Sequence, residues 1–201
     1  DSKPAEHSPR LAEIMQREFS ALNLKTGAIV CGCGGGEAVR KVLPKVLQES
    51  RLLVLDADAL NVISKDAWLR QLLRLRAAKK WLTVITPHPL EAARLLNTHS
   101  AAVQGDRLLA ALTLTEDLKC TVVLKGSGTV IAKAGKTTVI NPTGNARLAT
   151  GGTGDVLAGL LGARMAQGLD EFEAACAAVY EHGQVADIDA CASAHEGHSP
   201  T

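Results

Sequence analysis

Short apolar runs alternate along the chain with segments in which apolar residues recur at helical spacing. The apolar runs are Ala28–Cys31, Leu52–Leu55, Trp81–Ile85 and Thr121–Leu124. They are nearly continuous rather than alternating, which is typical of strands buried on both faces of a sheet. Helices are expected between them, with starts near Glu37 and at Pro89 and with spans of 65–78 and 103–118. This order predicts an α/β fold with a mostly parallel sheet and helices on both faces.

Three further elements are predicted outside this alternation. Residues 8–22 carry apolar side chains on a helical period and predict a packing helix. Val130–Ala132 and Thr137–Ile140 flank a glycine as the two strands of a β-hairpin would. Residues 171–190 predict a last helix that packs on the core, in which His182 is expected to be structural.

A second glycine-rich group, Gly151-Gly152-Thr153-Gly154-Asp155, lies within the stretch Asn141–Gly168, after one at residues 32–36. Three glycines in four residues leave a run of unobstructed backbone N–H groups. Apolar residues at helical spacing follow at once, so these N–H groups lie at a helix N-terminus. Because such N–H groups lack intrahelical partners and the helix dipole is positive there, the run is predicted to cradle a phosphate.

Asp155 has two interpretations. A carboxylate in the first turn of a helix complements the helix dipole, and that alone would explain its presence. An acid beside a phosphate cradle would repel the ligand, however, unless it has a chemical task. The obvious task is to take a proton from a hydroxyl that attacks the phosphorus.

Four polar or glycine-rich segments come directly after predicted strands: Gly32–Gly36, Asp56–Asp58, Thr86–Pro89 and Lys125–Thr129. In open α/β sheets, ligands bind at the edge where the strands end, so we expect these segments to share one site. Each also has a simpler interpretation, in order a tight turn, a helix cap, a structural histidine and a hairpin turn. His88 lies between two prolines that restrict its backbone, which favours a ligand contact.

The composition excludes several classes of protein. The 201 residues suit one domain. Twenty-two Lys and Arg against 21 Asp and Glu give a net charge of +1, so nucleic acid is a poor candidate partner. No apolar run approaches the roughly 18 residues of a membrane span, and the N-terminus does not resemble a signal peptide. We therefore expect a soluble, cytoplasmic protein. The five cysteines suggest no disulfide framework, and a metal at Cys31-Gly-Cys33 is not expected.

The sequence GNARLATGGTGDVLAG closely resembles the signature of the ADP/ATP-dependent NAD(P)H-hydrate dehydratases, a branch of the ribokinase-like superfamily. Three more segments resemble the same family in the same order, namely Leu53–Asn61, Thr86–Leu96 and Val123–Ala132. The resemblance covers about residues 28–185.

This resemblance implies a ribokinase-like fold and the conversion of hydrated NADH or NADPH back to NADH or NADPH. It implies ADP or ATP as phosphoryl donor, Mg²⁺ as counter-ion with ligands that the sequence does not name, and Asp155 as the catalytic base. The residues that it assigns to the substrate are Gly34, Gly36, His88 and Asp155. Those that it assigns to the nucleotide are Lys125, Gly126, Ser127, Gly128, Thr129, Asn145, Gly151, Gly152, Thr153 and Gly154.

The chain departs from the family pattern in places. Cys33 replaces the usual proline, Gly35 an aliphatic residue and Leu90 a glycine. The family would have a further strand-helix unit before Asp1 and a closing segment after Thr201, so we expect a single domain over 1–201 that is truncated at both ends.

Two other functions stay open from the sequence. One is a small-molecule kinase of the same superfamily, acting on a sugar or on a thiazole or pyrimidine alcohol. The other is a binding domain without catalysis. For the dehydratase we expect a small-molecule substrate and a homo-oligomer.

Overall fold

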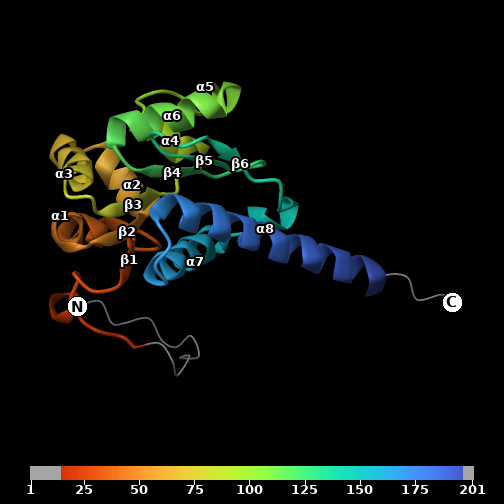
Figure 1. The fold of residues 1–201 in the computed structure, drawn as a ribbon, viewed down its shortest axis with the longest axis horizontal. Coiled ribbons are helices and arrows are strands. Elements are labelled where there is room, and N and C mark those ends of the chain that lie inside the picture. The colour runs from red at the N-terminus through yellow and green to blue at the C-terminus, as the bar shows by residue number, and fades with distance from the viewer. Residues whose placement is uncertain (1–14, 197–201) are drawn as a thin grey trace.

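The computed structural model describes residues 15–196, with side chains as far as residue 192 (Figure 1). Six strands form one sheet in the order of the sequence. Four are parallel: β1 (Ala28–Cys31), β2 (Leu52–Leu55), β3 (Leu82–Ile85) and β4 (Thr121–Leu124). Two continue the sheet antiparallel, β5 (Val130–Ala132) and β6 (Val139–Ile140). The predicted strands and the mostly parallel sheet are confirmed.

Helices cover both faces of the sheet (Figure 1). One face carries α1 (Val39–Glu49), α2 (Ala57–Ser64), α3 (Ala67–Ala78), α4 (Pro89–Leu95), α5 (Ser100–Gly105) and α6 (Arg107–Leu118). The other face carries α7 (Thr153–Ala166) and α8 (Glu171–Glu196). Because a parallel strand must be followed by a crossover, each of the first three strands is followed by one or more helices.

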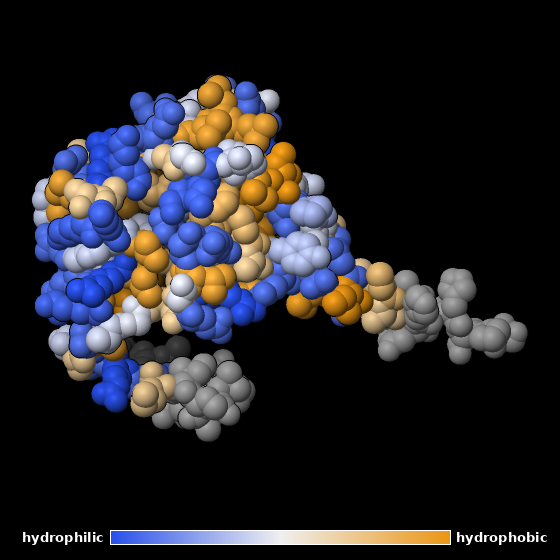
Figure 2. Space-filling model, viewed as in Figure 1, coloured by the Kyte–Doolittle hydropathy of each residue, from blue (hydrophilic) through white to orange (hydrophobic). Residues whose placement is uncertain are grey.

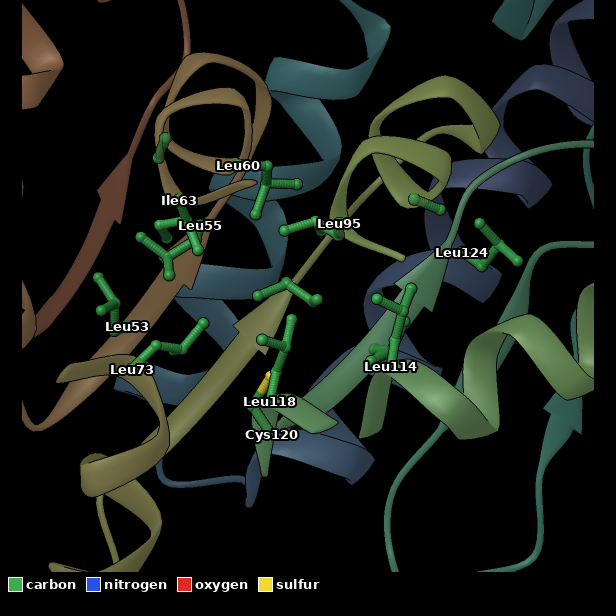
Figure 3. Packing of buried hydrophobic residues seen from close by; sticks show 14 of the residues in the cluster. Leu53, Leu55, Leu60, Ile63, Leu73, Leu95, Leu114, Leu118, Cys120 and Leu124 are labelled. Atoms are coloured by element: carbon green, nitrogen blue, oxygen red, sulfur yellow. The ribbon is translucent and has the colours of Figure 1, made fainter. Parts of the chain in front are cut away.

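The core has two parts, because successive side chains of a strand point to opposite faces. Leu53 and Leu55 of β2 pack with α1–α6, in the larger cluster that Figure 3 shows. Val54, between them, packs with α7 and α8. All three side chains are fully buried, which explains why the apolar run of β2 is continuous.

Two helix predictions are wrong in part. Residues 15–22 of the predicted helix 8–22 are irregular except for a 3₁₀ turn at Phe19–Ala21, and residues 8–14 lie outside the described part of the chain. The predicted helix 103–118 is divided at Asp106, where the backbone leaves the helical conformation (φ −146°). The Asp106 side chain accepts a hydrogen bond from the Leu109 N–H (2.9 Å), so it starts a second helix there.

Candidate active site

The segments predicted to share a site meet at the edge of the sheet where the parallel strands end. Asp56 follows β2 and is buried, and its Oδ1 lies 2.7 Å from Nζ of Lys125, which follows β4. Asp56 Oδ1 also accepts a hydrogen bond from the Ala57 N–H (2.9 Å), so Asp56 caps α2 as well. The helix-cap interpretation of Asp56 is therefore confirmed, and the same carboxylate faces the candidate site.

The glycine-rich run begins α7 beside this ion pair. Gly152 precedes the helix with φ +89°, a conformation that glycine adopts at little cost. A Cβ on Gly154 would lie 3.4 Å from the Lys125 Nζ and 3.7 Å from an Asp56 carboxylate oxygen. The first turn of α7 thus presents its backbone directly to Lys125, as a phosphate cradle requires.

Asp155 lies next to Cys33 and Asp56. One ligand atom from each of the three residues lies within 4.8 Å of the other two. Burial, the charges of Asp56 and Asp155 and a hydrogen bond to Asp155 raise the pKa of the Cys33 thiol to about 12. Cys33 is therefore a neutral thiol near pH 7 that donates to the carboxylate of Asp155.

The two carboxylates of this group suit Mg²⁺, which prefers oxygen ligands. The thiol does not suit Mg²⁺, because sulfur prefers softer metals. Lys125 already balances the charge of Asp56. Within this group only the carboxylates of Asp56 and Asp155 are suitable ligands, and phosphate oxygens of a nucleotide would have to complete the coordination.

The turn after β1 is held against α2. Gly32 has φ +121°, and a Cβ there would lie 1.8 Å from the Asp56 carbonyl oxygen, so only glycine fits. The N–H of Gly36 donates to Asp58 Oδ2 (2.7 Å). Gly34 and Gly36 are exposed, with φ of +60° and +53°. The second carboxylate of Asp56–Asp58 thus fixes the turn to which the predicted substrate glycines belong.

His88 has a structural role that sequence reasoning weighed as its simpler interpretation. Its Nδ1 accepts hydrogen bonds from the N–H groups of Leu90 (3.1 Å) and Glu91 (3.4 Å), and Glu91 Oε2 in return accepts one from the His88 N–H (2.8 Å). This reciprocal pair is a capping box at the start of α4. The ring is also half-exposed and lines the cavity described next. His88 therefore both caps α4 and belongs to the candidate site.

A cavity of about 570 Å³ opens beside Lys125 and the first turn of α7. Among the predicted nucleotide residues, those that line it are Lys125, Gly126, Ser127, Gly128, Thr129, Asn145, Thr153 and Gly154. Gly151, Gly152, Asp155, Gly34 and Gly36 do not line it. Eight of the ten predicted nucleotide residues thus line one cavity, whereas Gly151 and Gly152 do not. Asp155 and the substrate glycines lie on the Cys33 side of α7 instead.

Sequence reasoning missed several residues of this region. Arg107, at the start of α6, donates to the backbone oxygens of Ser127, Leu124 (3.0 Å) and Lys125 (3.2 Å), and so holds the turn after β4. Nothing in the local sequence signals this role. His182 of α8 also lines the cavity, and burial lowers the pKa of its ring, while a hydrogen bond with the Thr153 backbone opposes that shift.

The fold and the site together define a class of protein. An open α/β sheet with a glycine-rich helix start and an adjacent acid at the strand ends is what the ribokinase-like superfamily shares. A ribokinase-like superfamily protein of Enterococcus faecalis superposes on 81% of this chain with a TM-score of 0.66 and 29% identity, over 55% of its own length.

Within that class, the family model described as NAD(P)H-hydrate dehydratase matches residues 4–198. The chain belongs to this family. It is 45% identical over 168 residues to the ADP-dependent (S)-NAD(P)H-hydrate dehydratase of Neisseria meningitidis, a match that covers 83% of the chain and 55% of that protein. The ADP/ATP-dependent NAD(P)H-hydrate dehydratase of Bacillus subtilis, co-crystallised with ATP and Mg²⁺, superposes with a TM-score of 0.66 and 32% identity, over 80% of the chain and 55% of that chain.

The chain therefore spans about half the length of the relatives that it matches. The predicted family and the ribokinase-like fold are confirmed. Among the described residues, no helix is both long and apolar enough to cross a membrane.

Proposed function

We propose that this protein uses ADP or ATP to dehydrate hydrated NADH or NADPH. The observation that carries the proposal is the position of Asp155, in the first turn of α7 and beside both Cys33 and the Asp56–Lys125 pair. A base, a cation and a helix N-terminus thus lie together at the ends of the strands. Lys125 and the first turn of α7 line a cavity whose volume, about 570 Å³, is within the range of small-molecule sites. The dehydration for which the family is named would use these three groups together.

In the proposed reaction, Asp155 accepts the proton of the ring hydroxyl of the hydrate. The hydroxyl oxygen forms a bond to the terminal phosphorus of the nucleotide, and the bond from that phosphorus to the bridging oxygen breaks. The carbon–oxygen bond of the phosphorylated ring then breaks. Phosphate leaves, a proton is lost from the neighbouring ring carbon, and the nicotinamide double bond is restored.

The first turn of α7 and Lys125 stabilise the charge that develops on the transferring phosphoryl group. Their N–H groups and ammonium are in place before the reaction, so no reorganisation is needed when the charge appears. Mg²⁺, bound chiefly through phosphate oxygens, would neutralise further charge when present. The ligand set of Asp56 and Asp155 fits such an ion only in part.

The two ligands would bind on opposite sides of Asp155. We assign the nucleotide to the cavity, with Lys125–Thr129, Asn145 and Gly151–Gly154 around its phosphates and sugar. We assign the hydrated nicotinamide ring to the side of Gly34, Gly36 and His88. His88 also lines the cavity, so in this proposal the nicotinamide ring would meet the nucleotide near His88.

Incubation with hydrated NADH and either ADP or ATP tests the proposal, with the absorbance of reduced nicotinamide as the readout. Recovery of that absorbance, dependent on the nucleotide, is the expected result. A kinase for another alcohol would give no recovery. Nucleotide binding without recovery would indicate a binding domain without catalysis.

A further inference from the structure

One wall of the cavity is an irregular segment, residues 141–149, which we call the wall segment. The wall-segment residues that line the cavity are Asn141, Thr143, Gly144, Asn145, Ala146, Leu148 and Ala149. Apart from a 3₁₀ turn at Ala146–Ala149, this segment has no regular secondary structure. Its position therefore depends on contacts with other elements rather than on its own backbone hydrogen bonds.

Several of those contacts come from α8, besides one from Thr153 of α7 to the Leu148 carbonyl oxygen (2.7 Å). Asp187 Oδ2 accepts a hydrogen bond from the Gly144 N–H (2.8 Å), and its Oδ1 accepts one from Asn145 Nδ2 (3.0 Å). Asn145 Nδ2 also donates to the Ala186 carbonyl oxygen (2.8 Å). Asn145 Oδ1 in turn accepts from the Arg147 N–H (3.0 Å) and caps the 3₁₀ turn. One carboxylate on α8 thus holds the backbone of the wall segment and the side chain that organises the rest of it.

Two glycines, Gly183 and Gly144, allow the wall segment to approach α8 closely. A Cβ on Gly183 would lie 2.2 Å from Thr143 Oγ1, and Gly144 has φ +100°. Thr143 Oγ1 donates to the Tyr180 carbonyl oxygen (2.9 Å). The segment is therefore fitted to the surface of α8. Asp187 supplies charge-assisted hydrogen bonds to that attachment, beside the ion pair between Arg147 of the wall segment and Asp189 of α8.

We propose that Asp187 is a positioning residue for nucleotide binding, which acts through Gly144 and Asn145. Asp187 does not line the cavity, so it has no direct contact with a ligand there. Its carboxylate holds the wall segment in the binding conformation before the nucleotide arrives. Without it, part of the binding free energy is spent on ordering the segment, and the apparent affinity falls. The inference rests on the proposed function, since it takes the cavity ligand to be ADP or ATP.

The experiment compares Asp187→Ala, Asp187→Asn and the wild type by calorimetric titration with ADP. Asp187→Ala loses both hydrogen bonds to the wall segment, and we expect the dissociation constant to rise about tenfold or more. That corresponds to about 1.4 kcal/mol for each factor of ten. Asp187→Asn keeps one acceptor oxygen and places an NH₂ group against a donor, so its dissociation constant should fall between the other two.

Glu173→Gln is the matched control, because Glu173 is an exposed carboxylate on the same helix. Removal of its charge should leave ADP affinity unchanged. Hydrogen exchange supplies a second readout: the amides of residues 141–149 should exchange faster in Asp187→Ala and slow down again with ADP bound. At saturating ADP, the turnover number should approach that of the wild type.

The outcomes separate this inference from the proposed function. A wild-type protein that binds neither ADP nor ATP contradicts the proposed function. ADP binding that is equal in the wild type and in both Asp187 variants overturns the role of Asp187 and leaves the proposed function standing. If ADP affinity, turnover at saturation and thermal stability all fall together in Asp187→Asn, Asp187 is only a structural residue.

Discussion

Lys125 and Asp56 form an ion pair in the candidate site, and the side chain of Asp56 is 2% exposed. Loss of one partner of such a pair leaves a buried charge without compensation. Lys125 also lines the cavity, so its ammonium has both a structural partner and, in the proposed function, a ligand. The two roles call for two different variants.

Lys125→Ala should destabilise the fold by about 3 kcal/mol, because Asp56 keeps its charge. It should also raise the dissociation constant of ADP about tenfold, through loss of one charge-assisted hydrogen bond. Adding Asp56→Asn removes the buried charge and keeps a cap on α2, so most of the stability should return. Urea unfolding and ADP titration measure the two effects. If ADP affinity is normal in both variants, the turn after β4 is only a hairpin turn and does not bind the nucleotide.

His88 can be tested for a ligand contact without loss of its cap. His88→Asn keeps a side-chain acceptor at the start of α4, whereas His88→Ala costs about 1 kcal/mol of stability. We expect His88→Asn to leave the melting temperature nearly unchanged and to raise KM for the hydrated nicotinamide severalfold, with ADP affinity unaffected. A normal KM in His88→Asn would leave the capping box as the whole role of His88.

Cys33 reports on Asp155 independently of activity. A thiol whose pKa is about 12 is almost entirely protonated at pH 8, and only the thiolate is alkylated. Alkylation of Cys33 should therefore be slow at pH 8 and should accelerate with pH until about pH 12. Asp155→Asn removes a charge and an acceptor that both raise this pKa, so it should speed the reaction.

Cys31 provides the internal control, because burial alone raises its pKa to about 11. Peptide mapping after timed alkylation follows both thiols in one sample. Equal acceleration of Cys31 and Cys33 in Asp155→Asn would show a general loosening of the site. No change at Cys33 would contradict the contact with Asp155.

At the scale of elements, α7 carries both the cradle and part of the core. Leu157, Leu161 and Met165 bury one side of the helix against the sheet, and its first turn faces Lys125. Glycine weakens a helix, so Gly154 costs stability at a position where alanine would be a better helix former. A glycine at this position fits a need for close approach of a ligand to the backbone.

Gly154→Ala and Gly159→Ala make a matched pair on α7. A Cβ on Gly159 has nothing within 4 Å, so Gly159→Ala should stabilise by about 1 kcal/mol and spare nucleotide binding. The methyl of Gly154→Ala points at Lys125 and into the cavity. It should therefore weaken ADP binding at least tenfold without loss of fold. Thermal melts and ADP titrations of the pair measure both effects, and equal ADP affinity in the two variants would contradict the cradle.

The elements also show which local signals determine structure. Three of the four parallel strands, β2, β3 and β4, were predictable because burial on both faces makes their sequences continuously apolar. β1 is apolar too, although it is only partly buried and Val30 is exposed. The division at Asp106 was not, because apolar spacing continues across it and only the side-chain cap ends one helix and starts the next. The start of α2 was signalled by Asp56, whose helix-cap interpretation is confirmed, but the sequence did not give the extent of this helix.

At the scale of the whole molecule, the sequence predicts where the candidate site lies. It does not predict the long-range hydrogen bonds that hold the site together. The positions of the predicted segments followed from the rule that parallel strands end at one edge. Arg107 and Asp187 could not be found in this way, because their partners lie 20 and 43 residues away and only the folded chain brings them together. Such contacts depend on the packing of α6 and α8, which apolar spacing does not specify.

Helix α8 extends beyond the sheet, and part of its surface stays apolar (Figure 1 and Figure 2). Val185 and Ile188 are exposed there, at 67% and 62%. The expected homo-oligomer stays a prediction, as do the single domain over 1–201 and its truncation. Because the chain spans about half the length of its relatives, activity has to be measured on this chain rather than inferred from theirs.

The central claim is that Asp155 is the base of a nucleotide-dependent reaction, and Asp155→Asn tests it most directly. Asparagine keeps the size of aspartate but cannot accept the proton, so recovery of NADH from its hydrate should fall by roughly 10² to 10⁴. ADP should bind as well as before or slightly better, because a negative charge beside the phosphates is removed. Near-normal turnover, or a joint loss of turnover, ADP binding and fold, would contradict the claim.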